Sequence, residues 1–194
     1  MRVGVLGGTF DPVHTGHLIL AEQARDQLQL DLVLFIPAGD PWRKAHREIT
    51  HASHRLAMLQ LAIEGNPHFG ISDVELKREG PSYTADTLTA LAAERLDDEF
   101  YFIVGADALN DFPYWRDPDR IIRHATLAVA PREEDGVDVA ALNVPGLDRR
   151  IVSFRMPRID ISSTDIRERA ATSSVRYLVP PTVADYIEAH GLYR

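Results

Sequence analysis

The sequence predicts an α/β fold in which a doubly wound, mostly parallel sheet carries helices on both faces. Short apolar runs alternate along the chain with segments whose apolar residues recur at helical spacing, and this alternation is typical of successive βαβ units. Several apolar runs end at glycine or proline, which terminate strands. Because no repeat, low-complexity tract or linker interrupts the pattern, we expect one domain over 1–194, with a small helical portion from about 162 to 194.

The N-terminal third predicts two strands and two helices. Val3–Leu6 is an apolar run that stops at a glycine pair, and 16–30 carries an apolar stripe at helical spacing. Leu32–Ile36 is a second buried strand, closed by a proline. The segment 41–53 is polar and basic, which predicts a surface loop, and a helix follows over about 52–64.

The remaining elements follow from the same reasoning. Ser82 and Thr84 can cap the helix that begins after Gly80-Pro81, and Asp117-Pro118 precedes a short helix. The segment 132–150 is charged and contains Gly and Pro, which predicts a loop or weak structure, the best candidate for disorder. The other predicted strands are 69–71, 100–104, 126–130 and 151–154, and the last helices begin at Ser163 and at Pro180-Pro181, the second ending near Gly191.

Composition excludes several classes of protein. Of 194 residues, 45% are hydrophobic and 26% charged, which is ordinary for a globular chain. There is no cysteine, and therefore no disulfide, thiolate metal site or cysteine nucleophile. The net charge of -8 argues against nucleic acid as a partner. No targeting segment and no apolar run of about 20 residues is present, so we expect a cytoplasmic protein with no membrane partner.

The segment 7–17 is the most informative part of the chain. It follows a strand and precedes a helix, which is where a parallel sheet offers a nucleotide crevice. Glycines allow main-chain amides to approach phosphate, and the helix N-terminus adds positive potential. His14 and His17 could face the same side and donate hydrogen bonds to a phosphoryl group. A tight turn without function and a metal site are the alternatives, but no third ligand accompanies the histidines. The predicted ATP contacts here are Gly7, Gly8, Thr9 and Phe10.

A second segment, Ile161-Ser162-Ser163-Thr164-Asp165-Ile166-Arg167, combines hydroxyls at a helix start with an arginine one turn later. Such a helix end can bind the β- and γ-phosphates of a nucleotide. We therefore predict ATP contacts at Ile161, Ser162, Ser163 and Thr164, and a catalytic role for Arg167. At least one of the three hydroxyls is expected to serve as an N-cap instead.

These two segments resemble the Gly-x-Phe-Asp-Pro-x-His-x-Gly-His and Ile-Ser-Ser-Thr-x-Ile-Arg signatures of the nucleotidyltransferase superfamily. Further segments are similar to bacterial nicotinate mononucleotide adenylyltransferases: Ser82-Tyr83-Thr84-x-Asp86-Thr87-Leu88, the strand ending in Gly105-Ala106-Asp107, and Pro113-Tyr114-Trp115. The likeness covers nearly the whole chain except about 132–150, and it implies a Rossmann-like fold.

The resemblance also implies roles for these segments. Tyr83 and Thr84 would contact the pyridine carboxylate, Trp115 would stack on the pyridine ring, and Asp107, after Gly105, would hold ribose hydroxyls. Trp115 could instead belong to the core, but its polar neighbours favour stacking.

One segment departs from the family pattern. Members often carry Pro-Pro-His-Lys after the second strand, whereas this chain has Pro41-Trp42-Arg43-Lys44. Lys44 still suits a catalytic cation facing phosphate, while the role of Arg43 stays open. No protein metal site is predicted; Mg²⁺ would be bound through the phosphates of ATP.

The sequence as a whole predicts ATP-dependent adenylyl transfer to nicotinate mononucleotide, giving deamido-NAD and pyrophosphate. The predicted partners are therefore ATP and nicotinate mononucleotide, and formation of a homo-oligomer is left open. The alternative acceptors are nicotinamide mononucleotide and phosphopantetheine. A non-catalytic nucleotide sensor is the alternative from another class, but it would not need His14, His17, Lys44 and Arg167 together.

Overall fold

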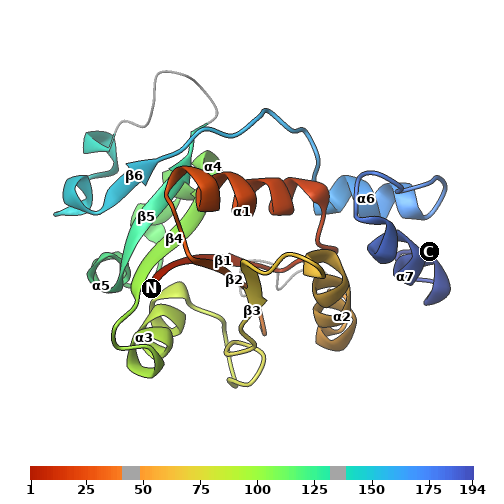
Figure 1. Cartoon of the computed structure of the whole chain (residues 1–194), viewed down its shortest axis with the longest axis horizontal. Helices are drawn as coiled ribbons and strands as arrows, with labels where there is room; N and C mark the ends of the chain where they lie inside the picture. The colour runs from red at the N-terminus through yellow and green to blue at the C-terminus, as the bar shows by residue number, and fades with distance from the viewer. Residues whose placement is uncertain (41–48, 132–138) are drawn as a thin grey trace.

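A computed structural model describes residues 1–40, 49–131 and 139–194. Six strands in these residues form one sheet of order β3-β2-β1-β4-β5-β6, and all neighbouring strands are parallel (Figure 1). The strands are β1 (Arg2–Gly8), β2 (Leu32–Pro37), β3 (Phe69–Ile71), β4 (Glu99–Gly105), β5 (Ala125–Ala130) and β6 (Ile151–Ser153). The predicted Rossmann-like, doubly wound sheet is confirmed, and its strand order reverses between β1 and β4.

Helices cover both faces of the sheet, as predicted. Residues of α1, α2 and α7 share one buried apolar cluster, whereas those of α3 and α5 belong to a second. Figure 1 shows α1 and α3 on opposite sides of the sheet. The helices are α1 (Thr15–Gln27), α2 (Ala52–Ile63), α3 (Thr84–Glu94), α4 (Ala106–Asn110), α5 (Pro118–His124), α6 (Ser163–Ala170) and α7 (Pro181–Ala189).

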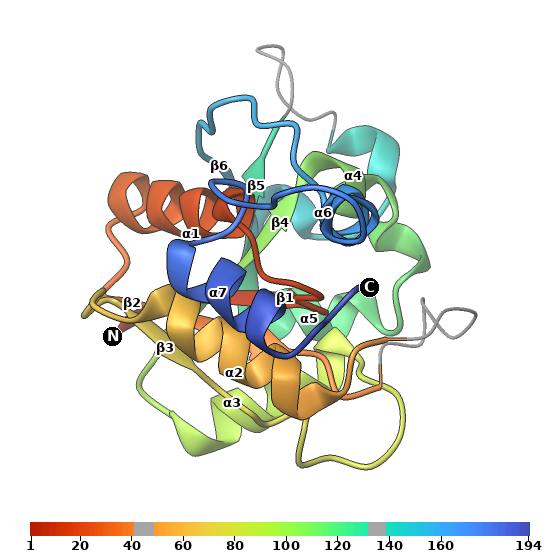
Figure 2. The same ribbon diagram turned by 90° about the vertical axis from the view of Figure 1, so that its right-hand side faces the viewer.

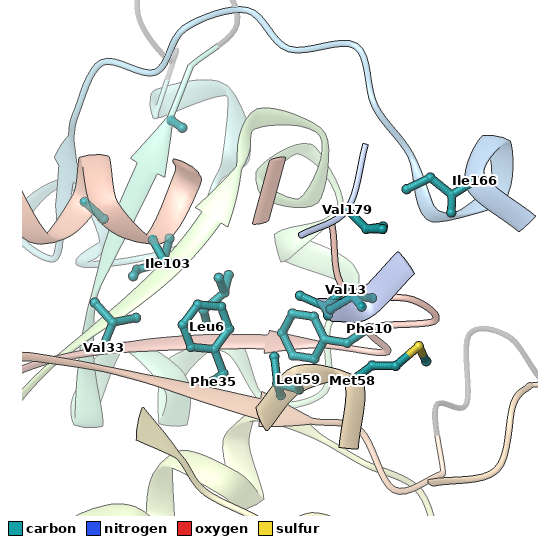
Figure 3. Close-up of a cluster of buried hydrophobic side chains, with 14 of the residues drawn as sticks. Leu6, Phe10, Val13, Val33, Phe35, Met58, Leu59, Ile103, Ile166 and Val179 are labelled. Atoms are coloured by element: carbon teal, nitrogen blue, oxygen red, sulfur yellow. The ribbon is translucent and has the colours of Figure 1, made fainter. Parts of the chain in front are cut away.

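The alternation of side chains along the strands builds the two cores. In β1, Val3 and Val5 belong to the α3 side, whereas Leu6 belongs to the α1 side. The core on the α1 side continues past the end of β1, where Phe10 and Val13 are buried (Figure 3). The connection from β1 to α1 is therefore anchored in the core by apolar side chains.

Several local predictions were wrong. The strand β1 does not stop at the glycine pair but includes Gly7 and Gly8, because both pair with β2. Ser82 and Thr84 do not cap α3: its N-cap is Tyr83, without a side-chain cap, and the Ser82 hydroxyl accepts a hydrogen bond from the Gly39 N–H instead. The short helix α4 was not predicted.

The later segments also add detail. The short helix predicted after Asp117-Pro118 is α5, and the structure adds that Asp117 is its N-cap, since the Asp117 side chain accepts from the Arg120 N–H. Within the predicted loop 132–150, residues from 139 on contain two 3₁₀ turns, η3 (Ala140–Leu142) and η4 (Leu147–Arg149). Leu142 and Leu147 are buried in the core on the α3 side, so this part of the loop contributes to packing.

The C-terminal helices lie where β1 ends. Figures 1 and 2 show α6, α7 and the end of the chain beside the carboxyl end of β1, and α7 packs on α2. Within the described ranges, none of the helices combines the length and apolar character needed to cross a membrane.

Candidate functional site

The two predicted phosphate-binding segments meet at the carboxyl end of β1. Arg167 in α6 donates through Nη1 to the Asp11 carbonyl oxygen at 2.7 Å, and the Ser163 hydroxyl donates to the Pro12 carbonyl oxygen at 2.9 Å. Behind them, the Thr15 N–H donates to the Leu178 carbonyl at 2.9 Å. We call residues 9–14 the first-motif loop. Segments more than 150 residues apart in sequence thus form one surface.

The imidazoles of His14 and His17 lie together, as their spacing suggested. Their rings stack with centroids 3.7 Å apart and an interplanar angle of 28°. The His14 main-chain N–H donates to Nδ1 of His17 at 3.2 Å. Because Nδ1 of His17 accepts this hydrogen bond, the proton of its neutral ring resides on Nε2, which is then a donor. A main-chain donor of the first-motif loop therefore fixes the tautomer of His17.

His14 occupies a different environment. Its side chain is buried, and burial lowers the pKa of His14 to about 4. In the described part of the chain, its Nδ1 has no hydrogen-bond partner. Gly16 leaves room for this ring, since a Cβ at that position would lie 3.0 Å from Nδ1 of His14. The neutral ring is thus held by packing.

Hydroxyls at the start of α6 all have partners within the protein. Ser162 is the N-cap, and its oxygen accepts from the Asp165 N–H at 3.1 Å. The Thr164 hydroxyl accepts from Nη2 of Arg167 at 3.0 Å. Ile161, beside them, packs on the apolar core. The expected N-cap role is confirmed for Ser162, whereas phosphate contacts at this helix start stay a prediction.

The glycines and Phe10 have packing roles as well. A Cβ at Gly8 would lie 2.9 Å from the Phe10 ring, whereas the nearest atom at Gly7 would be 3.8 Å away. Phe10 has a φ of 50° and is 1% exposed, so its side chain belongs to the core. Any contact of Phe10 with ATP would therefore use its main chain. The Thr9 carbonyl accepts from Arg55.

Residues predicted to bind the mononucleotide lie on the α3 side of the sheet. Tyr83, at the start of α3, lies under the guanidinium of Arg116, whose carbon is 4.4 Å from the ring centroid. Thr84 begins α3 and is half-buried. Trp115 is half-buried and packs edge-to-face on Phe102, with centroids 5.8 Å apart. Trp115 therefore contacts the core while keeping part of its surface exposed.

For two predicted residues, Lys44 and Asp107, the structure does not describe the side chain. Lys44 lies outside the described residues, as do Trp42 and Arg43. Gly105 is the N-cap of α4, and Asp107 lies within α4, but the side chain of Asp107 is also outside the described part.

Sequence reasoning missed Arg55, which is 2% exposed. Its guanidinium donates to the carbonyl oxygens of Thr9 at 2.7 Å, Ala38 at 2.8 Å and Thr50 at 2.9 Å. A signal was present, because Arg55 occupies the apolar stripe of α2 with Met58 and Leu59. An arginine at a core position of an amphipathic helix requires buried acceptors.

The fold and the site together are those of the α/β nucleotidyltransferases. A family model described as cytidylyltransferase-like matches residues 5–169. A probable nicotinate-nucleotide adenylyltransferase of Thermomicrobium roseum is 50% identical over 196 residues, covering 100% of this chain and 92% of the relative. Another, from a Roseiflexus species, is 48% identical over 195 residues, covering 99% and 98%. The chain belongs to the nicotinate-nucleotide adenylyltransferase family.

A solved structure has the same fold. The nicotinic acid mononucleotide adenylyltransferase of Plasmodium falciparum, complexed with NaAD, superposes with a TM-score of 0.80 at 18% identity. The match covers 99% of this chain and 97% of that one.

Proposed function

We propose that this chain transfers the adenylyl group of ATP to nicotinate mononucleotide, releasing pyrophosphate and forming deamido-NAD. The observation that carries the proposal is the meeting of the first-motif loop and the start of α6 at the point where the strand order reverses. Ligands of open α/β sheets bind at that point. The relatives named above support adenylyl transfer to this acceptor.

The reaction is an in-line displacement at the α-phosphorus. A phosphate oxygen of the mononucleotide forms the new P–O bond, the bond to the bridging oxygen of pyrophosphate breaks, and pyrophosphate carries away the electron pair. Such transfer depends on positioning and on stabilisation of charge. His17 would donate from Nε2 to the transferring group, and Arg167 and Lys44 would hold the leaving phosphates.

His14 enters the reaction neutral. Its pKa of about 4 leaves the imidazole uncharged at neutral pH in the free protein. An approaching triphosphate would raise the pKa of His14, because a nearby negative charge favours the protonated ring. His14 would therefore be easier to protonate when the nucleotide is bound than in the free protein.

The acceptor and the ribose would be held on the α3 side. Tyr83 and Thr84 would contact the pyridine carboxylate, and the exposed part of Trp115 would stack on the ring. Gly105 and Asp107, at the start of α4, would contact ATP at its ribose. For the phosphates, Gly7, Gly8, Thr9 and the main chain of Phe10 would lie on one side, and the residues from Ile161 to Thr164 on the other.

Mg²⁺ is the proposed cation of ATP. Across residues 1–40, 49–131 and 139–194, no group of three or more His, Asp or Glu side chains could hold a metal ion. Oxygen atoms of the phosphates and water suit Mg²⁺, so we propose that it binds through ATP. When bound, it neutralises charge on the phosphates. The proposed unit is one domain over 1–194 that works in the cytoplasm, where ATP is supplied.

The test measures pyrophosphate release from ATP and Mg²⁺ with nicotinate mononucleotide, nicotinamide mononucleotide or phosphopantetheine as the acceptor. We expect release with nicotinate mononucleotide and a much lower kcat/KM with the other two. The variant His17→Ala should lower kcat by about 100-fold or more, because one donor to the developing charge is lost.

The matched control is His68→Ala, since His68 is exposed and its ring contacts the Asp31 carbonyl. This variant should keep its activity. No release with any acceptor would contradict the proposed function and favour the nucleotide sensor; full activity of His17→Ala would contradict the role of His17 alone.

A further inference from the structure

A tyrosine near the end of the chain reaches into the first-motif loop. The Tyr193 hydroxyl donates to Oδ1 of Asp11 at 2.9 Å, and these residues are 182 positions apart. We propose that Tyr193 is a positioning residue of the transfer site, acting through Asp11 on the loop that carries His14. This proposal rests on the proposed function.

The burial of Asp11 explains why its carboxylate needs the hydrogen bond from Tyr193. Asp11 is 1% exposed, and a buried carboxylate needs donors that replace water. Burial raises the pKa of Tyr193, and the negative charge of Asp11 raises it further. Tyr193 therefore keeps its proton throughout the pH range of a working enzyme and stays a donor.

Arg55 connects the same carboxylate to the surroundings of the site. Burial lowers the pKa of Arg55, and the charge of Asp11 counteracts that effect. Arg55 holds the carbonyls of Thr9, Ala38 and Thr50, so it fixes the start of the first-motif loop to the chain on both sides of segment 41–48. The negative charge of Asp11 thus stabilises the buried positive charge of Arg55, which holds these three carbonyl groups together.

The first-motif loop is consequently held from two sides through one residue. Arg167 donates a hydrogen bond to the main-chain oxygen of Asp11, and the Tyr193 hydroxyl donates one to the Asp11 carboxylate. Without the Tyr193 hydroxyl, the Asp11 side chain loses a partner that restricts its rotation. The loop then gains freedom three residues before His14, while the apolar anchors Phe10 and Val13 keep the fold intact.

The experiment compares Tyr193→Phe, which removes only the hydroxyl, with Tyr177→Phe at a tyrosine that is 88% exposed. We expect Tyr193→Phe to lower kcat about 10-fold, since small misplacements of reacting groups have effects of this order. The KM values for ATP and the mononucleotide should change less than kcat. Hydrogen–deuterium exchange of the ligand-free protein should be faster over 9–15 in Tyr193→Phe only.

A double-mutant cycle with Asp11→Asn tests whether Tyr193 acts through Asp11. If Tyr193 acts through Asp11, adding Tyr193→Phe to Asp11→Asn should lower kcat by less than twofold. A lower melting temperature with unchanged kcat and unchanged exchange over 9–15 would overturn the proposal, leaving Tyr193 only structural. An inactive wild-type protein would contradict the proposed function, and exchange over 9–15 would still decide whether Tyr193 orders the loop.

Discussion

His14 and His17 present the same functional group in two different states. His17 is half-buried, with its tautomer set by a main-chain N–H, whereas His14 is buried and neutral. Two residues three positions apart thus acquire distinct chemistry from their surroundings rather than from their type.

The buried state of His14 predicts a pH dependence of folding stability. Its pKa is about 4 when folded and 6.5 in an unstructured chain. Between these values the unfolded chain binds the proton and the folded one does not, so stability falls as pH falls from 6.5 to 4. The loss should reach about 3 kcal/mol. Urea unfolding of wild type and His14→Asn from pH 7.5 to 4 measures it.

The difference between the two proteins isolates His14, because other titrating groups are common to both. Wild type should lose its free energy of unfolding more steeply below pH 6.5 than His14→Asn does. Parallel curves over this range would contradict the burial of a neutral imidazole.

Gly16 gives a second prediction at this scale. The variant Gly16→Ala would place a Cβ 3.0 Å from the His14 ring, which also stacks on the ring of His17. We expect kcat to fall about 10-fold as the ring shifts. Alanine has a higher helix propensity than glycine, by up to about 1 kcal/mol. This gain offsets the cost of crowding at the His14 ring, so the free energy of unfolding should change little.

The control for crowding is Gly70→Ala in β3, whose Cβ would meet the Leu34 side chain at 3.2 Å. Its kcat should remain that of wild type. Equal kcat in wild type and Gly16→Ala would show that the space beside His14 has no functional importance.

Among the elements, α3 depends on a buried polar contact with the segment before it. The Thr87 hydroxyl donates to Oε1 of Glu75 at 2.6 Å and accepts from Nη2 of Arg78 at 3.1 Å. Thr87 and Glu75 are both buried. This contact secures the chain that leads to Tyr83 and Thr84.

The variant Thr87→Val keeps the shape and removes the donor to Glu75. We expect a loss of about 1–3 kcal/mol of unfolding free energy, because a buried carboxylate loses a partner. Thermal or urea unfolding measures it. Thr89→Val is the matched control: its hydroxyl donates to the Ala85 carbonyl of the same helix, so its loss should be smaller. Equal losses would contradict the special role of the Glu75 contact.

Element boundaries were predictable where apolar patterning alone decides them. The six strands formed by the described residues were all predicted, because each includes a short apolar run between turn signals. Gly7 and Gly8 were placed outside β1 because glycine has low strand propensity, yet pairing with β2 keeps them in the strand. The prediction that Ser82 caps α3 was wrong because its hydroxyl accepts a hydrogen bond from the Gly39 N–H, which is a tertiary contact.

The site was predictable only in part for a related reason. The spacing of the motif predicted that His14 and His17 face the same side, and the structure shows their rings stacked. It could not show that the Phe10 ring turns into the core, because the φ of 50° depends on the surrounding packing. Nor could it pair Tyr193 with Asp11, since a contact between distant residues leaves no local pattern.

At the scale of the whole molecule, charge and topology explain how an acidic protein can hold a polyanion. The net charge of -8 is spread over the chain, whereas Arg167 and the start of α6 lie at one end of β1. The parallel sheet makes this possible, because it gathers the carboxyl ends of strands that are distant in sequence.

The contact between Tyr193 and Asp11 also bears on how the molecule is made. Asp11 leaves the ribosome early in synthesis, and its partner emerges 182 residues later. Pairing across such a separation forms late, after more local structure. The nascent chain can therefore build most of its sheet before Tyr193 is synthesised, and the first-motif loop gains this contact only after most of the fold has formed.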